Sequence, residues 1–400
     1  MPGPEAAAAM LIPDDYQPGY ARARLADPAM AETYLRHTTL GDPEADAVTA
    51  LLLPYPAEQQ RDWLRLGVEQ GPAALDSAPA GLRDFFAGIE AAPPWFDAAA
   101  ALPGCRAFHR NSEMFIGAFV AAVLIEGFAT LISKSFSITG RLVDQGVRRL
   151  KQNNLHLVEI FMPGGLDRHG DGWRLSVRIR LMHARIRQLL AQSPEWEGQA
   201  WGTPLSAAHI GYATASFSGL LLQRARMLGV ELSDAERQSF MMVWRYAGQL
   251  MGVPPALACA TEAEAMRLRD IGILCEPPPG IESILLANNL INSAPIVADI
   301  TEPAARRALS KRIYQVSRAL IGDTLADQLN YPPSRRFGVL GMLRLTNRTE
   351  RLLRGWFPAL ERYRRFGQFQ RMLDVSFHSP TGISYRMPGH LHAERDRPAA

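Results

Sequence analysis

VRIRLMHARIR, residues 177–187, has the period of an amphipathic α-helix, and the pattern extends over residues 172–192. The apolar face of this predicted helix consists of Leu175, Ile179, Met182, Ile186 and Leu190. His183 lies at the margin of that face. Arg180 and Arg187 lie three residues before and four residues after it, on the same side of the helix.

This combination of residues is suited to binding a haem group. A neutral imidazole on an apolar face can bind the iron of a porphyrin, and arginines at the mouth of the pocket can pair with the haem propionates. The sequence therefore predicts His183 as the metal ligand, with Arg180 and Arg187 as further cofactor-binding residues. The alternative is a half-buried histidine on a basic helix, and residue spacing alone leaves both interpretations open.

A second helix is predicted over residues 139–162, and it carries Arg149, Asn153 and His156 within one sector. Arg149 and Asn153 can face the other side of a cofactor and donate hydrogen bonds to oxygen, which makes them the candidate catalytic residues. His156 is an alternative iron ligand, and so is His209 on a strongly apolar helix. The competing interpretation of the helix over residues 139–162 is a solvated polar face. For His209 it is a core histidine whose hydrogen bonds are satisfied within the protein.

The rest of the chain predicts an all-α protein with one large helical domain over residues 26–385, because helical periodicity dominates and no alternating strand pattern occurs. Helices with capping residues are expected at 42–53, 56–71 and 233–254. Residues 1–25 are predicted to be a disordered tail, and residues 386–400 a loose tail. The apolar stretch 114–133 is long enough to span a bilayer, but it contains Glu126, so a buried central helix is favoured over a membrane span.

Composition excludes several classes of function. The 400 residues include 43 basic and 40 acidic side chains, a balance that argues against nucleic acid as a partner. The three cysteines are far apart, and no CxxCH motif occurs, so a haem would be non-covalent haem b in a reducing compartment. The N-terminus does not resemble a signal peptide, which predicts a cytoplasmic protein. The arginine-rich region 338–373 either covers the core or contacts an anionic membrane surface.

VRIRLMHARIR resembles the haem-ligand helix of the latex clearing protein family of rubber oxygenases, which includes the oxygenase of mycophenolic acid biosynthesis. Further similar stretches occur in the family's order, and together they cover roughly residues 40–350. They are DPEADAV (42–48), TGRLVDQGVRRL (139–150), ATASFSGLLL (213–222) and VWRYAGQLMGVP (243–254).

The resemblance implies a globin-like all-α core that holds haem b through one histidine, at the position of His183. It implies cleavage of isoprenoid carbon–carbon double bonds with dioxygen. Arg149 matches the family's distal arginine, whereas Asn153 replaces a threonine. We therefore expect a haem-dependent oxygenase acting on an apolar, unsaturated small molecule. The alternatives are a haem carrier or gas sensor and a cofactor-free membrane-surface protein, and the sequence leaves the oligomeric state open.

Overall fold

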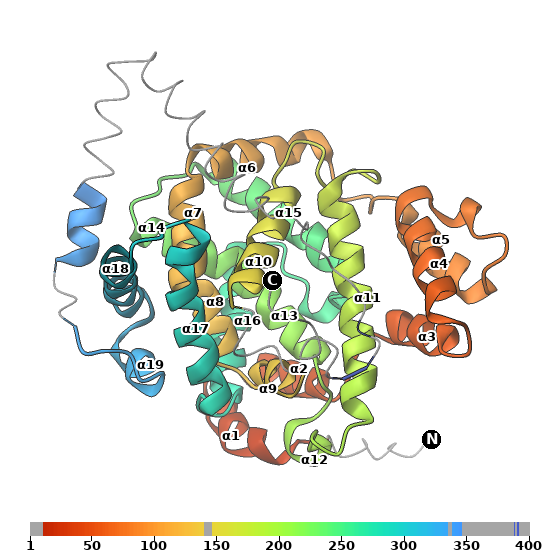
Figure 1. Cartoon of the computed structure of the whole chain (residues 1–400), viewed down its shortest axis with the longest axis horizontal. Coiled ribbons are helices and arrows are strands. Elements are labelled where there is room, and N and C mark those ends of the chain that lie inside the picture. The colour runs from red at the N-terminus through yellow and green to blue at the C-terminus, as the bar shows by residue number, and fades with distance from the viewer. Residues whose placement is uncertain (1–10, 140–145, 335–337, 346–387, 389, 392–400) are drawn as a thin grey trace, which may run out of the picture.

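Helices account for the regular structure of the computed structural model, which describes residues 11–139, 146–334, 338–345, 388, 390 and 391 (Figure 1). No strand occurs in these ranges. The helices form one large all-α domain, as predicted, while the globin-like character of its core stays a prediction. The first eleven α-helices are α1 (Gln17–Ala26), α2 (Pro28–Thr38), α3 (Pro43–Leu52), α4 (Ala57–Gln70), α5 (Ala80–Glu90), α6 (Ala98–Arg110), α7 (Ser112–Ala118), α8 (Leu124–Phe128), α9 (Ile132–Ile138), α10 (Gly146–Ile160) and α11 (Asp171–Ala191). The others are α12 (Gly198–Trp201), α13 (Ala207–Ala215), α14 (Leu221–Met227), α15 (Asp234–Leu250), α16 (Glu262–Cys275), α17 (Ile281–Val297), α18 (Pro303–Ile321) and α19 (Asp323–Gln328).

The capping residues recognised in the sequence begin and end several helices. Asp42 accepts a hydrogen bond from the backbone N–H of Ala45 at the start of α3. Gly71 ends α4 with a φ of 86°, a conformation that favours glycine. Ser233 and Glu236 form the predicted capping box of α15. These three helices are therefore confirmed close to their predicted bounds.

The prediction of a disordered tail over residues 1–25 is wrong for the part that the structure describes. A 3-10 turn, η1 (Asp14–Tyr16), leads into α1, and the side chain of Tyr16 is fully buried. α1 packs against both α2 and α16. Residues 1–10 lie outside the described residues. The prediction failed because small and aromatic residues make this contact, without the regular apolar period of an amphipathic helix.

The apolar stretch 114–133 is buried but does not form one straight helix. It passes through α7, a π-helical segment η3 (Phe119–Val123) and α8, and it breaks again before α9. In the described parts of the chain no single helix is both long and apolar enough to cross a bilayer. Two consecutive helical segments, Ala98–Arg110 and Ser112–Phe128, are long and apolar enough only when they are taken together. The chain bends by 82° between them.

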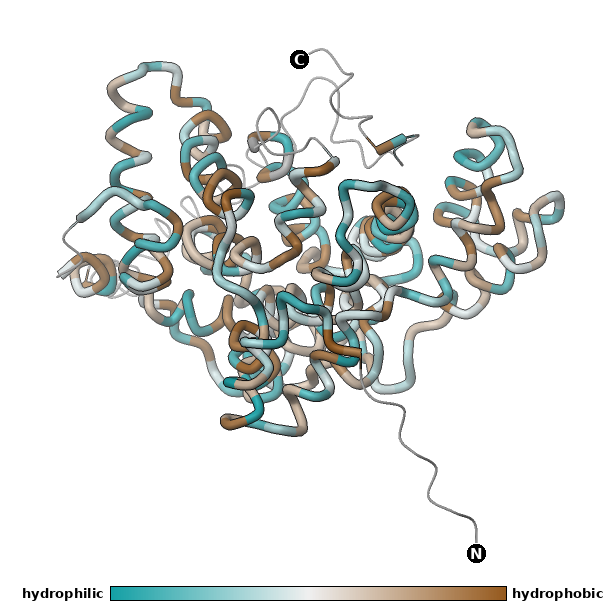
Figure 2. Tube along the Cα trace, turned by 90° about the horizontal axis from the view of Figure 1, so that it is seen from below, coloured by the Kyte–Doolittle hydropathy of each residue, from teal (hydrophilic) through white to brown (hydrophobic). Residues whose placement is uncertain are grey.

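The arrangement of the helices places α10 and α13 in the middle of the molecule (Figure 1). α10 packs against α11 on one side and α17 on the other. Helices α3 to α5 project at one side of the molecule, and α18 and α19 lie at the opposite side, in both views (Figures 1 and 2). The site described below therefore lies in the central layer, away from both projecting groups.

The C-terminal predictions fall mostly outside the described residues. This holds for most of the arginine-rich region 338–373 and for all but three residues of the predicted tail 386–400. Within that tail, Pro388 is buried, and its carbonyl oxygen lies 3.3 Å from Arg185 Nε. Leu391 packs against the core. At these two residues the chain contacts the domain, and the loose tail over residues 386–400 stays a prediction.

Candidate active site

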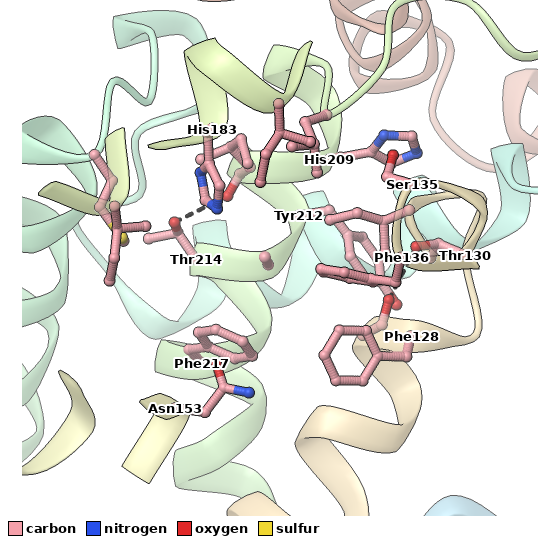
Figure 3. Close-up of a pocket in the computed structure, with 18 of the residues that line it drawn as sticks. Phe128, Thr130, Ser135, Phe136, Asn153, His183, His209, Tyr212, Thr214 and Phe217 are labelled. Atoms are coloured by element: carbon pink, nitrogen blue, oxygen red, sulfur yellow. Dashed lines mark hydrogen bonds between the residues drawn. The ribbon is translucent and has the colours of Figure 1, made fainter. Parts of the chain in front are cut away.

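A pocket lies between α8, α9, α10, α11 and α13. A second π-helical segment, η4 (Ser216–Leu220), follows α13 and contributes Phe217 to its wall. None of the described residues that line the pocket is an Asp, Glu, Lys or Arg. Several are aromatic, including Phe128, Phe136 and Phe217 (Figure 3). The pocket therefore suits a mostly apolar ligand.

His183 projects into this pocket from α11. The apolar residues Ile179, Met182 and Ile186 of the same helix also line the pocket, so the helical spacing seen in the sequence does place the imidazole among them. The ring of His183 and the side chain of Thr214 on α13 point toward one another (Figure 3). The structure thus places the predicted ligand where a bound group can reach it.

Helix α10 supplies another wall, through Gln152, Asn153 and His156. Asn153 lies beside Phe217, well apart from His183 in the pocket (Figure 3). Asn153 and His156 therefore share the side of α10 that faces the pocket, in line with the sequence pattern. The side chain of Arg149, the other predicted catalytic residue, lies outside the described residues.

His156 is held in one orientation by Ser176 of α11. Its Nε2 lies 2.9 Å from Ser176 Oγ, and that hydroxyl donates its own proton to the carbonyl oxygen of Gly172 at 2.8 Å. Since the serine proton is used there, Nε2–H of His156 must be the donor and Nδ1 the acceptor. Burial lowers the pKa of His156 to about 4, so the ring is neutral near pH 7.

His209 also lines the pocket, but both of its ring nitrogens have partners. Nε2 lies 3.0 Å from the hydroxyl of Tyr16 and 3.3 Å from Glu276 Oε1, and Nδ1 lies 3.2 Å from the hydroxyl of Ser206. Burial by itself would raise the pKa of Glu276, but His209 and the hydrogen bond from Tyr34 outweigh it and hold that pKa low. His209 is therefore a core histidine whose two ring nitrogens both have partners within the protein. This matches the interpretation that competed with its role as an iron ligand.

Arg180 and Arg187 do not lie where the sequence analysis expected them. Arg180 is buried and forms a bidentate pair with Asp42, at 2.5 and 2.8 Å, and a further bond to Glu44 at 2.8 Å. Arg187 Nη1 lies 3.4 Å from Asp46 Oδ1. Neither arginine lines the pocket that His183 enters. The expected position at its mouth is wrong because α3 covers this side of α11 and supplies acidic partners.

A group of hydroxyl side chains that the sequence pattern did not single out also lines the pocket. They are Thr130, Ser135, Thr139 and Thr214. The first three follow the break after α8, where the sequence TLISKSFSIT places polar residues at intervals in an apolar stretch. That interruption was the available signal, although spacing alone does not show which of these side chains face a cavity.

Comparison with known proteins agrees with this arrangement of helices. A curated protein named rubber oxygenase, from Streptomyces sp. (strain K30), is 27% identical over 275 residues. The aligned region covers 66% of this chain and 61% of that protein, so the chain spans less than two thirds of the relative's length. A solved structure of latex clearing protein LCP in the closed state is similar with a TM-score of 0.64. Its sequence identity is 21%, and the match covers 85% of this chain and 90% of the other, which supports the fold.

A family model described as ER-bound oxygenase mpaB/B'/rubber oxygenase, catalytic domain, matches residues 105–352. This range includes α7 to α19 and every described wall of the pocket. Because the match spans more than half of the 400 residues, the chain belongs to this family of oxygenase catalytic domains.

Proposed function

We propose that this protein is a haem-b-dependent oxygenase that uses dioxygen to cleave a carbon–carbon double bond of an apolar, isoprenoid-like molecule. The observation that carries the proposal is the position of His183, which enters a mostly apolar pocket without charged residues in its described lining. Membership of the oxygenase family supports the reaction class. The printed name of the Streptomyces relative, rubber oxygenase, supports the isoprenoid character of the substrate.

The residues present fit a haem group. His183 is the histidine that would hold the iron, because it enters the pocket from α11 beside the apolar side chains of Ile179 and Met182. An apolar, aromatic-lined pocket suits the flat faces of a porphyrin. When bound, the haem supplies an iron atom that binds and activates dioxygen.

The chain's own side chains would supply orientation and exclusion of water. Asn153 carries an amide N–H that can donate a hydrogen bond to dioxygen in the pocket, and Arg149 stays the second predicted donor. Leu124, Ile210 and Phe217 cover the pocket with apolar surface. In such surroundings the effective dielectric constant is low, so a donor of fixed orientation has a stronger effect than it has in water.

The proposal predicts that the full-length protein binds added haemin and shows the spectrum of haem b. His183→Ala should lose haem during gel filtration, because it removes the bond from the protein to iron, while its helix content is retained since alanine favours helix. His169→Ala is the matched control, because His169 is exposed on a loop. Absorbance spectra, circular dichroism and an oxygen electrode with an unsaturated isoprenoid provide the measurements.

The outcomes separate the parts of this proposal. If His183→Ala keeps the haem content and spectrum of the wild type, another residue holds the iron. If the wild type binds haem but consumes no oxygen with any unsaturated isoprenoid, the oxygenase activity is contradicted. A protein that takes up no haemin contradicts the cofactor assignment itself.

A further inference from the structure

Three residues with hydroxyl side chains line the pocket where the chain turns from α8 into α9. They are Thr130, Ser135 and Thr139, and each residue is at most 3% exposed. Thr130 and Ser135 lie across the pocket from His183 and Asn153 (Figure 3). The pocket thus has a hydroxyl-lined end that the oxygenase proposal does not use.

The two threonines have already used their hydroxyl protons. Thr130 Oγ1 donates to the carbonyl oxygen of Gly127 at 2.9 Å. Thr139 Oγ1 donates to the carbonyl oxygen of Ser135 at 2.8 Å. A hydroxyl group has one proton and two acceptor lone pairs, so each threonine offers only an acceptor to the pocket.

Ser135 differs from both threonines. Its residue is 1% exposed, yet its hydroxyl has no hydrogen-bond partner in the structure. Buried polar groups without partners are rare in folded proteins because they are destabilising. The hydroxyl of this pocket-lining residue therefore leaves a hydrogen bond that a ligand can complete.

A hydroxyl group on the ligand matches this set of donors and acceptors. Its oxygen can accept the proton of Ser135 Oγ, and its own proton can be donated to Oγ1 of Thr130 or Thr139. An ether satisfies only the first of these bonds, and a hydrocarbon satisfies neither. A carboxylate would bring a charge to a pocket whose described lining contains no cation, with no proton for the threonine acceptors.

We infer that this end of the pocket binds a hydroxyl group of the substrate, so that the substrate is an unsaturated isoprenoid-like alcohol. The inference rests on the proposed oxygenase function for the isoprenoid part of the molecule. The hydroxyl would hold one end of the substrate at Ser135, with the apolar chain extending toward Phe217 and His183. Ser135 is then a specificity-determining residue.

The test compares farnesol with farnesyl methyl ether, which differ in one hydrogen-bond donor. Isothermal titration with the wild-type, full-length protein should give a dissociation constant about tenfold lower for farnesol, because a site built to bond a hydroxyl rejects the analogue that lacks it. Ser135→Ala should weaken farnesol binding by about tenfold. Ser137→Ala is the matched control, since it makes the same change in α9 at a residue that does not line the pocket.

Equal affinity of the wild type for the alcohol and the ether would overturn the inference, and this comparison requires no variant to fold. Unchanged farnesol affinity in Ser135→Ala would overturn it as well. Oxygen uptake, measured separately, tests the proposed function. A preference for farnesol that depends on Ser135 supports the inference even if no oxygen is consumed, whereas oxygen uptake without any preference leaves the oxygenase proposal intact and removes this one.

Discussion

The ring of His156 is kept neutral by its surroundings, and this has a consequence for stability. Its pKa is lowered from 6.5 to about 4 by burial. Between these values the unfolded chain takes up a proton at this residue and the folded protein does not. The stability of the folded state must therefore fall as the pH falls from about 6.5 to about 4, by at most about 3 kcal/mol for this residue.

His156→Gln should lack this contribution. Its free energy of unfolding, compared with that of the wild type, should become relatively more favourable as the pH is lowered from 7 to 4. Urea unfolding at a series of pH values measures the difference. His169→Gln, which removes an exposed ring, controls for the loss of a histidine. A difference between wild type and His156→Gln that is independent of pH would contradict the assignment.

At the scale of single residues, helical spacing predicts which side chains share a face. His183 and its apolar neighbours share a face because helical spacing dictates it, and the pocket confirms that arrangement. The partners of Arg180 could not be predicted in this way. Asp42 lies 138 residues away along the chain. Spacing shows which residues share a side of a helix, but not which distant element covers that side.

At the scale of single helices, the π-helical segments show a further limit of sequence periodicity. η3 and η4 interrupt the two apolar stretches that the sequence predicts as continuous helices, and they contact one another. Such a segment shifts the register by one residue, which an apolar run does not reveal. π-helical segments are frequent at functional sites, and here η4 carries Phe217 into the pocket wall.

The charge inside the first apolar stretch is stabilised by two distant arginines. Glu126 is 1% exposed, accepts bonds from Arg224 at 2.8 and 3.0 Å, and also pairs with Arg269. Glu126→Leu should therefore destabilise the protein even though it makes the stretch more apolar, because it leaves two largely buried guanidinium groups without this partner. The expected loss in the free energy of unfolding is about 3 kcal/mol.

Urea unfolding of Glu126→Leu measures that loss, with Glu58→Leu as the control at an exposed position of α4. The control should change the free energy of unfolding by no more than about 0.5 kcal/mol, as is usual for a surface substitution. Wild-type stability in Glu126→Leu would mean that the arginines find other partners and that Glu126 does not anchor α8.

For the whole molecule, the N-terminal helices matter because they support the wall of the pocket. Tyr16 contacts His209, and Tyr34 donates to Glu276 at 2.6 Å, so η1 and α2 are joined to α13 and to the end of α16. The sequence suggested a tail because residues 1–25 lack an apolar period. Burial of tyrosines on a polar network is a tertiary effect, and it cannot be recognised before the partners at 209 and 276 are known.

The closest approach in this N-terminal contact occurs at Gly19. A Cβ atom at this position would overlap the carbonyl group of Cys275, so α1 can lie against α16 only with glycine there. Gly19→Ala should force the helices apart and lower the free energy of unfolding by about 2 kcal/mol, the usual cost of overpacking. Gly88→Ala is the matched control, because it lies within α5 with nothing near its added Cβ. That change should raise stability by roughly 0.5–1 kcal/mol through helix propensity. Urea unfolding of the two variants beside the wild type measures both effects. If Gly19→Ala proves as stable as Gly88→Ala, residues 14–26 do not pack against α16 as the structure shows. In that case the hydrogen bond between Tyr16 and His209 does not support the pocket wall.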